Sequence, residues 1–394
     1  MKEGWEYKTL GEICKIYNGN SINADNKKKH FLGATGGLPF IATKDVSPLG
    51  TIDYNNGVRI PNYEEYKVAP ANSVFICAEG GSAGKKFAYV EKDVCFGNKL
   101  FCITPKDKAI KGKFIYHFVQ SDNFRGQFFS LLTGLIGGVS AKKFQTIEIP
   151  VPSLSEQQSI VDYLDSAFAK IDAMKANAEK ALNEAKALFQ ASLKEMLEPK
   201  EGWEEKTLKD VSVIYGNYGL SVPSAEYNGV RYLRITDITE WGDLNDEKVS
   251  AKLDEEKEQE LLEEGDILFA RTGATVGKTL MYKEAFGKCL FAGYLIRYRI
   301  NKEIVLPKFI FYITHSANYY KWVLENQKAA AQPNISAKLY NEYVVSYPSI
   351  PEQQSIVETL DSLKSKVDRL QENYDKISQE CDALKQAILR QVFE

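Results

Sequence analysis

Residues Pro152–Asp165 read PSLSEQQSIVDYLD, and residues Pro348–Asp361 read PSIPEQQSIVETLD. A second similar pair precedes them, with KEGWEYKTL at Lys2–Leu10 and KEGWEEKTL at Lys200–Leu208. The offsets are 196 and 198 residues in a chain of 394, so each copy occupies half of the protein. A repeat of this size indicates two copies of one structural unit, and it suggests a pseudo-twofold molecule that grips one object in two places.

The size and composition favour a folded protein with two or more domains. The hydrophobic content of 44% is enough for folded cores. We find no apolar stretch of the roughly 18 residues that a membrane span needs, and the amino terminus lacks the apolar core of a signal peptide. We therefore expect a cytoplasmic protein.

The net charge of −3 is unevenly distributed along the chain. Residues 1–154 carry 20 Lys and Arg against 14 Asp and Glu, a net charge of +6, whereas residues 199–351 carry 19 against 22. Seven of those 22 acids lie in the run DEEKEQELLEE at Asp254–Glu264, which we interpret as a solvated helix face. The net charge of the whole chain is therefore a poor guide to whether it binds a polyanion.

The segments after Ser153 and Ser349 are predicted to be long helices, because apolar residues recur in steps of four and three. Both begin with a capping-box pattern, Ser153-x-x-Glu156 and Ser349-x-x-Glu352. The expected seam of the first helix is Ile160, Leu164, Ala167, Ile171, Met174, Ala178, Ala181, Ala185, Leu188 and Ser192. The expected seam of the second is Ile356, Leu360, Leu363, Val367, Leu370, Tyr374, Ile377, Cys381, Leu384 and Ile388.

The first seam is rich in alanine and the second in large side chains, which favours packing of one helix against the other within the chain. We expect an intramolecular antiparallel coiled coil. In that arrangement Ala185 lies near Leu363, Ala181 near Val367 and Ala178 near Leu370. Self-dimerisation through either helix is the alternative.

The segments between the helices are predicted to be two similar α+β domains. A strand that runs into a polar turn occurs at Pro39–Val46 and again at Arg231–Ile238, and a strand followed by a glycine-rich loop occurs at Asn72–Lys85 and Gly265–Lys278. The expected organisation is a first domain at 1–153, a first spacer helix at 154–198, a second domain at 199–349 and a second spacer helix at 350–394.

The loop Gly273–Thr279 resembles a nucleotide-binding P-loop, but the spacing is one residue short and Thr272 stands where glycine is required. We therefore do not expect nucleotide hydrolysis. Loop amides, hydroxyls and lysines could instead hold a DNA phosphate, with Arg271 able to reach a base edge. The alternative is an ordinary hairpin turn with a solvated lysine.

No residues form a catalytic pattern, and we expect binding without chemistry. His117 falls opposite Tyr312 in the repeat, which a working acid–base residue in both halves would not tolerate. The six cysteines include no C-x-x-C pair, so a metal site or a disulfide framework is not expected, and the thiols are interpreted as small core or surface residues.

Two variable globular segments, each followed by a helix that starts near P-S-x-x-E-Q-Q-x-I-V at Pro152–Val161 and Pro348–Val357, resemble the specificity subunit of a Type I restriction-modification enzyme. The W-x-x-K-T-L segments at Trp5 and Trp203 and the R-T-G-x-x-x-G-K loop at Arg271 are similar to parts of its target recognition domains. The first loop departs from R-T-G, because it has Ala78-Glu-Gly-Gly. The resemblance covers essentially the whole chain.

The resemblance implies a non-catalytic subunit that recognises a split, asymmetric double-stranded DNA target, with one recognition domain for each half-site and a helical spacer that sets the gap. It also implies two methylation subunits that bind S-adenosylmethionine and two restriction subunits that hydrolyse ATP. No cofactor is expected on this chain; S-adenosylmethionine, ATP and magnesium belong to those partners. A coiled-coil scaffold with peptide-binding ends, and an enzyme that uses the glycine-rich loops, remain the alternatives.

The candidate DNA contacts are polar residues at equivalent places in both halves. Arg and Asp can distinguish base edges, whereas Ser, Thr and Lys more often hold phosphates. For Asp45 and Asp237 the alternative is that they only close a turn after a strand. The candidates are Thr43, Lys44, Asp45, Ser82, Lys85, Lys142 and Lys143 in the first half, and Arg234, Thr236, Asp237, Arg271, Thr275, Lys278 and Lys338 in the second.

Overall fold

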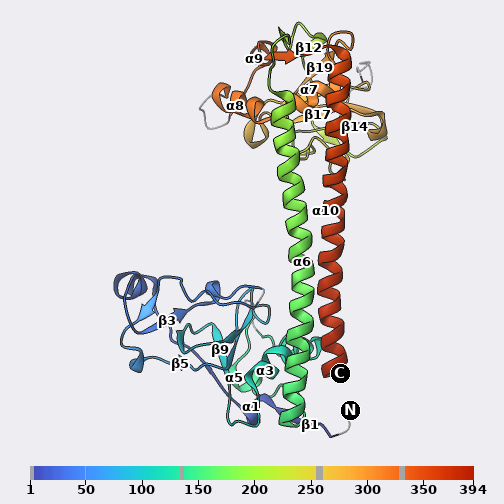
Figure 1. The fold of residues 1–394 in the computed structure, drawn as a ribbon. Coiled ribbons are helices and arrows are strands. Elements are labelled where there is room, and N and C mark those ends of the chain that lie inside the picture. The colour runs from blue at the N-terminus through green and yellow to red at the C-terminus, as the bar shows by residue number, and fades with distance from the viewer. Residues whose placement is uncertain (1–3, 49, 134–136, 254–260, 328–332) are drawn as a thin grey trace. The chain divides into compact units, whose positions relative to one another are not determined.

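The structure is a computed structural model that describes residues 4–48, 50–133, 137–253, 261–327 and 333–394. Its contacts divide the chain into two compact units. The first unit contains Met1–Ala178 and Tyr374–Glu394, and the second contains Glu179–Asn373. Each unit therefore combines one globular half with part of each long helix (Figure 1). Most of the acidic run that we interpreted as a helix face, residues 254–260, lies outside the described residues.

The globular half of the first unit mixes short helices with strands. Its elements are β1 (Glu6–Thr9), α1 (Leu10–Ile13), β2 (Cys14–Asn18), α2 (Ala24–Asn26), η1 (Lys27–Phe31), β3 (Leu38–Ile41), η2 (Thr43–Asp45), β4 (Arg59–Ile60), η3 (Tyr63–Glu65), β5 (Val68–Ala69), β6 (Ser73–Cys77), β7 (Phe87–Val90), β8 (Val94–Phe96), β9 (Leu100–Pro105), α3 (Gly112–Phe118), α4 (Asp122–Ser130), α5 (Ala141–Phe144) and β10 (Glu148–Val151).

The globular half of the second unit repeats the main strands and helices of the first, although several short elements differ. Its elements are β11 (Glu204–Thr207), β12 (Ser212–Tyr218), β13 (Ser224–Ala225), β14 (Arg231–Leu233), β15 (Ser250–Ala251), β16 (Ile267–Ala270), η4 (Gly273–Thr275), β17 (Thr279–Met281), η5 (Glu284–Phe286), β18 (Cys289–Phe291), β19 (Leu295–Ile300), α7 (Pro307–Ile313), α8 (Ala317–Asn326), α9 (Ala337–Asn341) and β20 (Val344–Tyr347). The long helices are α6 (Leu154–Leu197) and α10 (Ile350–Phe393).

The main strand pairings recur in both halves, which confirms the predicted α+β class with two similar domains, although β4 and β5 join the parallel pair only in the first half and β13 pairs with β15 only in the second. Each half has a four-stranded antiparallel sheet, in the order β2-β9-β6-β7 and β12-β19-β16-β17. A parallel pair lies beside each sheet, β3 with β8 and β14 with β18. The first and last strands of each half pair antiparallel, β1 with β10 and β11 with β20, so each half closes on itself before its long helix begins.

A buried glutamine from the repeated E-Q-Q motif joins each long helix to its globular half. Gln157 Nε2 donates to the carbonyls of Ala109 and Pro152, and its Oε1 accepts from the Lys111 amide. Gln353 makes the equivalent bonds with the carbonyls of Ile304 and Pro348 and the amide of Leu306. Because both side chains are at most 1% exposed, these bonds satisfy backbone groups that water cannot reach.

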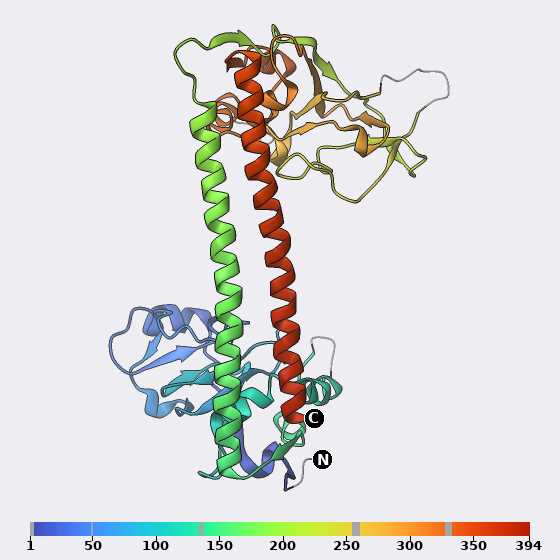
Figure 2. The ribbon, with the colours of Figure 1, turned by 45° about the vertical axis from the view of Figure 1, so that its right-hand side comes forward.

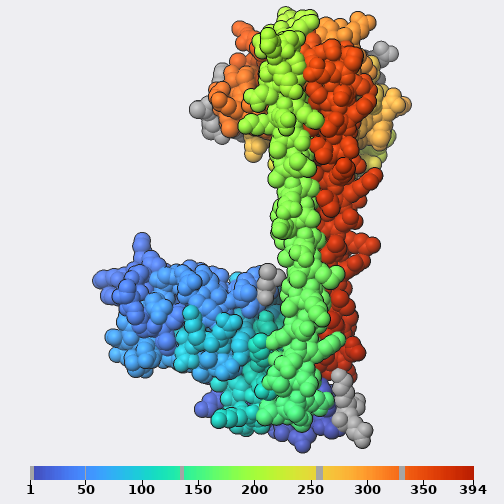
Figure 3. Space-filling view, viewed as in Figure 1, coloured from blue at the N-terminus to red at the C-terminus, as the bar shows by residue number. Residues whose placement is uncertain are grey.

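Eight residues after each glutamine, an aspartate on the same long helix binds two side chains of the globular half. Asp165 contacts Lys113 Nζ at 2.5 Å and His117 Nε2 at 2.9 Å, both on α3. Asp361 accepts from Lys308 Nζ at 2.7 Å and from the Tyr312 hydroxyl, both on α7. His117 and Tyr312 therefore replace each other as hydrogen-bonding partners of an aspartate. The side-by-side packing of each globular half on its segment of α6 or α10 is visible in Figures 2 and 3.

Within each unit, the long helices pack antiparallel, as the sequence predicted. In the first unit Asp172 bonds Lys385 at 2.6 Å and Lys175 lies 3.5 Å from Asp382, so one helix descends as the other rises. In the second unit Lys186 Nζ donates to Gln371 Oε1 at 2.8 Å.

The start of α6 has the predicted cap, because the Ser153 hydroxyl accepts from the Glu156 amide at 3.3 Å.

The predicted seam of α6 is buried or partly buried except at Met174, Ala181 and Leu188, where the prediction is wrong. Leu164 and Ile171 are buried, but Met174 and Leu188 are each 59% exposed, and Ala181 is exposed too. The buried positions between them belong to the next column of residues, Val161, Phe168, Leu182 and Phe189. The physical reason is that the globular halves share the seam, since Phe168 contacts His117 at 5.6 Å and Phe189 contacts Trp241 at 5.2 Å between ring centroids.

The predicted seam of α10 agrees with the burial of its residues at most positions. The predicted register of α10 against α6 is wrong. Ile356, Leu360 and Val367 are buried and Leu363, Leu370, Tyr374, Ile377 and Ile388 are partly buried, whereas Leu384 is 48% exposed. Cys381 Sγ lies 3.8 Å from the Ile171 carbonyl. The predicted register would place Ile377 there instead, so it is wrong by about one turn. Leu389, Val392 and Phe393 of α10 complete the core of the first unit.

The six cysteines are all buried, as small core residues. Burial raises the pKa of Cys14 to about 12 and that of Cys95 to about 11. These thiols are therefore protonated at neutral pH and poorly reactive.

Within the described parts of the chain, no helix is both long enough and apolar enough to cross a membrane.

Candidate nucleic-acid interface

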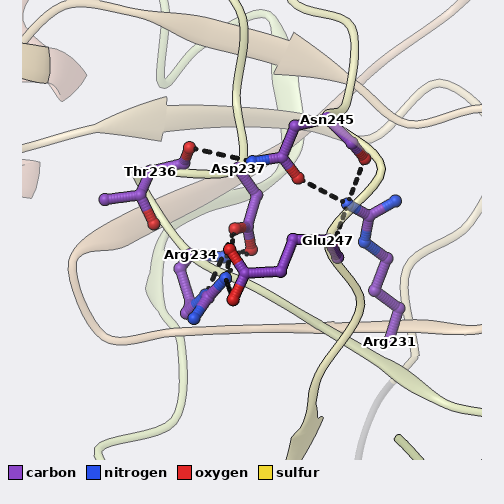
Figure 4. A network of polar contacts seen from close by, with 6 residues as sticks. All are labelled: Arg231, Arg234, Thr236, Asp237, Asn245 and Glu247. Carbon is purple, nitrogen blue, oxygen red and sulfur yellow. Dashed lines mark hydrogen bonds and ion pairs between the residues drawn. The ribbon is translucent and has the colours of Figure 1, made fainter. Parts of the chain in front are cut away.

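The turn after β14 carries two of the predicted DNA contacts, Arg234 and Asp237. Asp237 is 1% exposed, and its Oδ2 accepts from the Arg234 backbone amide at 2.8 Å. The Arg234 guanidinium donates to the same carboxylate at 2.7 Å and lies 3.0 Å from Glu247 Oε1. The hydrogen bond to Asp237 is the main reason why the pKa of Arg234 is raised above its ordinary value. The guanidinium is thus charged and held in one orientation (Figure 4).

A second arginine holds the neighbouring loop against this turn. Arg231 is buried in β14, and its Nη2 donates to the carbonyls of Asn245 and Glu247, each at 2.7 Å. Asn245 Nδ2 in turn donates to the carbonyl of Thr236 at 3.3 Å. Figure 4 shows this chain of contacts, which fixes the position of Glu247 beside Arg234.

The turn after β3 in the first half has the same construction. Asp45 Oδ2 accepts from the Ala42 amide at 2.8 Å, and Asp45 is buried as Asp237 is. Both aspartates therefore close a turn, which is the alternative that the sequence left open. Contact of either carboxylate with a base edge stays a prediction.

The glycine-rich loops are tight turns, and several of their amides already bond to carbonyls of the protein. The amides of Gly273, Val276, Gly277 and Lys278 donate to carbonyls of the protein at 2.9–3.1 Å, and those of Gly80, Ala83, Gly84 and Lys85 do so at 2.9–3.0 Å. These eight amides are not available to a phosphate, and a phosphate contact through the other amides of the loops stays a prediction. A Cβ on Gly277 would lie 2.8 Å from Val323, and one on Gly84 would lie 2.6 Å from Phe128. Both glycines are therefore required by close packing.

The side chain of Arg271 points from the second loop into a cavity of about 640 Å³. Its Cζ lies 4.8 Å from the ring centroid of Tyr218, and its Nε donates to Asn334 Oδ1 at 3.4 Å. The cavity is lined by Leu220, Ser221, Val222, Ser224, Tyr232, Arg234, Ile235, Thr236, Arg271, Ala292, Gly293 and Tyr294. Three predicted contacts, Arg234, Thr236 and Arg271, therefore meet at one site.

The first half has a cavity of about 250 Å³ at the equivalent place. It is lined by Asn20, Ile22, Lys27, Phe40, Ala42, Thr43, Lys44, Gly97, Asn98 and Lys99. Matching backbone pairings establish the equivalence, because Asn20 forms a parallel bridge with Gly97 as Leu220 does with Ala292. Both cavities thus lie between the turn after β3 or β14 and the segment after β8 or β18. Of the first-half candidates, Thr43 and Lys44 belong to this site.

The remaining candidates lie on neighbouring elements and do not line either cavity. Lys142 and Lys143 are exposed on α5 and Lys338 is exposed on α9. Each of these helices follows a segment that bridges to a glycine-rich loop, Gly138 with Glu79 and Asn334 with Thr272. Ser82 and Lys85 lie on the first loop and Thr275 and Lys278 on the second, and Thr275 Oγ1 donates to the Thr272 carbonyl at 3.1 Å. Their contacts with DNA stay a prediction.

Several residues that line the cavities were not predicted as DNA contacts, because they belong to no sequence motif. In the second half these are Leu220, Val222 and Tyr294, and in the first half Asn20, Lys27, Asn98 and Lys99. The parallel strand pairs bring them together from distant segments, which periodicity does not reveal. The one available signal was the run Lys27-Lys28-Lys29-His30 at η1, which has no counterpart in the second half.

The chemistry of both cavities is that of binding. The described residues that line them include cations, hydroxyls, amides and aromatic rings, and no His, Cys, Asp or Glu. Among the described residues of the whole chain, no group of three or more His, Cys, Asp and Glu is arranged to hold a metal ion. Such donors and cations suit phosphates and the acceptor edges of bases.

Known proteins with similar sequences are specificity subunits. The chain is 26% identical to the Type I restriction enzyme EcoKI specificity subunit of Escherichia coli K12, and the match covers all of this chain and 89% of that one. It is 24% identical to the StySPI specificity subunit of Salmonella potsdam, with the same coverage.

Two solved structures share the fold over the whole length of the chain. A chain from a study of complex assembly and conformational transition of the type I R-M system has a TM-score of 0.74 at 19% identity, with 98% of that chain covered. The HsdS subunit from Thermoanaerobacter tengcongensis has a TM-score of 0.59 at 20% identity, with 97% covered.

A match to a known domain family accounts for the internal repeat in the sequence. Residues 2–184 and residues 200–379 each match the Type I restriction modification DNA specificity domain. The chain therefore belongs to the Type I restriction modification DNA specificity domain family and carries two copies of that domain.

Proposed function

We propose that this chain, a non-catalytic specificity subunit with two DNA recognition domains, recognises an asymmetric bipartite target through the two equivalent cavities. The observation that carries the proposal is that each half places hydrogen-bond donors and cations at the same point of the same topology. The donors themselves differ, with Arg234 and Arg271 in one half against Lys44 and Asn98 in the other. Two different readers imply two different half-sites.

The recognition surface of each half extends from its cavity along the adjoining loop and helix. Thr43, Lys44, Ser82, Lys85, Lys142 and Lys143 contact the first half-site, and Arg234, Thr236, Arg271, Thr275, Lys278 and Lys338 contact the second. The exposure of Lys85, Lys142, Lys143 and Lys338 supports phosphate contacts, because a solvated ammonium can reach a backbone that lies over the surface.

The helices act as the spacer between the recognition domains, which occupy residues 1–153 and 199–349. Each helix has 44 residues. At about 1.5 Å per residue such a helix is roughly 66 Å long, which exceeds one DNA turn of about 34 Å. A spacer of that length leaves an unread gap between two half-sites.

The chemistry of the system belongs to the partners. Two methylation subunits with S-adenosylmethionine modify adenine, and two restriction subunits use ATP and magnesium. Specificity subunits are the named relatives of this chain, which supports the partnership. The complex works in the cytoplasm, where its DNA target lies.

Selection from a randomised duplex library tests this function. The full chain is purified with its methylation subunit, bound duplexes are amplified over several rounds, and the products are sequenced. We expect one enriched sequence with two short specified parts and a fixed unspecified gap. Enrichment of no bipartite sequence would instead favour a protein scaffold.

A further inference from the structure

The two equivalent cavities differ in the charges that they present. At matching positions the first half has Ala42, Lys44, Ala78 and Lys99, and the second has Arg234, Thr236, Arg271 and Tyr294. These matches follow from shared backbone bonds; for example, the amide of Ala78 donates to Lys99 and that of Arg271 donates to Tyr294. Arginine in one half is thus replaced by lysine, at different positions, in the other.

The first cavity has three ammonium groups, and the carboxylates that act on them are Asp45 on Lys27 and Glu79 on Lys99. Lys27, Lys44 and Lys99 line it. Among the described residues, no carboxylate lies within ion-pair distance of Lys27 or Lys44, and Glu79 lies at the limit of that distance from Lys99, at 4.0 Å. Lys27 Nζ is held 4.6 Å from the ring centroid of Phe40. Lys27 also begins a basic turn, since Lys28 and Lys29 follow it on η1.

The second cavity has guanidinium groups that are already engaged. Arg234 is paired with Asp237 and Glu247, so its charge is compensated. Arg271 stacks on Tyr218 and bonds Asn334, and Tyr294 beside it is 61% exposed. A fixed planar guanidinium next to aromatic rings is suited to the directional recognition of a base edge. It is less suited to a loose phosphate contact.

We propose that the two recognition domains divide the work: the cavity of Lys27, Lys44 and Lys99 clamps the DNA phosphates of the first half-site, whereas the second domain binds its half-site mainly through base contacts. This inference rests on the proposed DNA-recognition function. The net charge of +6 on residues 1–154 agrees with it. The first domain therefore supplies most of the salt dependence of binding.

Salt dependence gives a quantitative test, because each neutralised phosphate contributes about 0.9 to the slope of log K against log[salt]. The full chain is purified with its methylation subunit, and binding to a duplex that contains its selected target is measured from low to high salt. The variant Lys27→Gln/Lys44→Gln/Lys99→Gln is expected to lower the slope by about 2 to 3. It should weaken target and scrambled duplexes alike, so that the preference for the target is retained.

The matched control removes three exposed lysines of the same half that lie outside the cavity, Lys15→Gln/Lys92→Gln/Lys108→Gln. This control has the same net charge as the cavity variant, and its slope should change by less than about 1. An equal change in both triple variants, or an unchanged slope in the cavity variant, overturns the phosphate clamp. The single variant Lys44→Gln, at an exposed position, repeats the test with an expected change of about 0.9 if the triple variant does not fold.

A second measurement assigns the clamp to one half-site. Phosphates of each half-site are replaced in turn by uncharged methylphosphonates. Arg271→Gln identifies the half-site of the second domain, because only that half loses base discrimination. Replacement of phosphates in the half-site of the first domain should lower the affinity more than replacement in the half-site of the second. An equal loss of affinity in both half-sites contradicts the proposal. If the unchanged protein prefers no duplex at all, the proposed function itself fails, which is a different outcome.

Discussion

Arg271 lies over the ring of Tyr218, with its Cζ 4.8 Å from the ring centroid. The same tyrosine hydroxyl accepts a hydrogen bond from the Ala337 amide at 3.0 Å, so the ring is held by the first turn of α9. Tyr218 thus orders the guanidinium at the mouth of the second cavity. A base reader that is ordered before DNA arrives loses less entropy on binding.

Arg271→Ala should relax sequence recognition at one half-site only. We expect a loss of about 1 to 3 kcal/mol for the affected base pairs, because a base-edge contact disappears while the first domain is untouched. The measurement is the affinity for duplexes with single base-pair changes in each half-site. Equal loss at both half-sites contradicts the assignment of Arg271 to the second domain.

Tyr218→Leu should weaken the same base pairs by a smaller amount, about 0.5 to 1 kcal/mol, since Arg271 remains but loses the ring that orders it, and the Ala337 amide loses its acceptor. Tyr215→Leu is the matched control. Tyr215 lies on the same strand, but the cation over its ring is Lys209, at 5.1 Å, and not Arg271. If both substitutions have the same effect, Tyr218 does not act through Arg271.

Gln353→Leu should destabilise the second unit by about 1 to 3 kcal/mol for each buried group that it leaves unpaired. The groups at risk are the Leu306 amide and the carbonyls of Ile304 and Pro348. Denaturant unfolding of the full chain measures the loss. The exposed neighbour Gln354→Leu is the control, and it should have little effect. Similar losses for both would show that the buried amide is not what joins helix and domain.

The first unit should lose stability in acid, because protonation of Asp165 removes a stabilising contact with α3. The hydrogen bond with His117, together with that of Lys113, lowers the pKa of Asp165 to about 2 from a usual value of 3.8. The folded carboxyl therefore binds its proton less tightly than the unfolded one, and its contribution is present above about pH 4 and lost as the pH falls toward 2. Asp165→Asn should differ from the unchanged protein at pH 6 and converge with it only as the pH falls below about 2.

Thermal unfolding as a function of pH measures this difference. The exposed Asp162→Asn is the control, since it removes a carboxylate from the same helix outside the contact with α3. A constant difference between Asp165→Asn and the unchanged protein over the whole range would show that the contact does not depend on ionised Asp165.

Insertion of one heptad in both α6 and α10 should lengthen the unread gap of the target by about 3 base pairs. Seven residues add about 10.5 Å of helix, and DNA rises about 3.4 Å per base pair. Target selection with the lengthened chain measures the gap. A heptad in one helix alone breaks the antiparallel pairing and should abolish binding. An unchanged gap in the double insertion removes the spacer role.

The sequence predicted the architecture because duplication and periodicity are long-range signals. It did not predict the seam fully, since Ile160 and Val161, Ala167 and Phe168, and Leu188 and Phe189 offer two neighbouring apolar columns. The globular halves bury the second column, through contacts such as Phe189 with Trp241. A pattern within one helix cannot show which column a separate domain covers.

The candidate site was predicted where a motif marks it and missed where only the fold assembles it. Arg234, Thr236 and Arg271 follow strands at recognisable turns, and the structure brings them to one cavity. Tyr294 and Lys99 come from the segments after β18 and β8, which parallel pairing places beside those turns. For Asp45 and Asp237 the sequence left two roles open, because a turn-closing carboxylate and a base reader have the same spacing, and the structure shows the turn-closing role.

The most direct test is methylome sequencing of cells that express this chain with its methylation and restriction subunits, beside cells that carry Arg271→Ala. The account predicts one asymmetric bipartite methylated motif with a fixed gap, and relaxation of a single half of that motif in the variant. Methylation at a continuous or palindromic motif, or relaxation of both halves together, would contradict recognition by two separate and different domains.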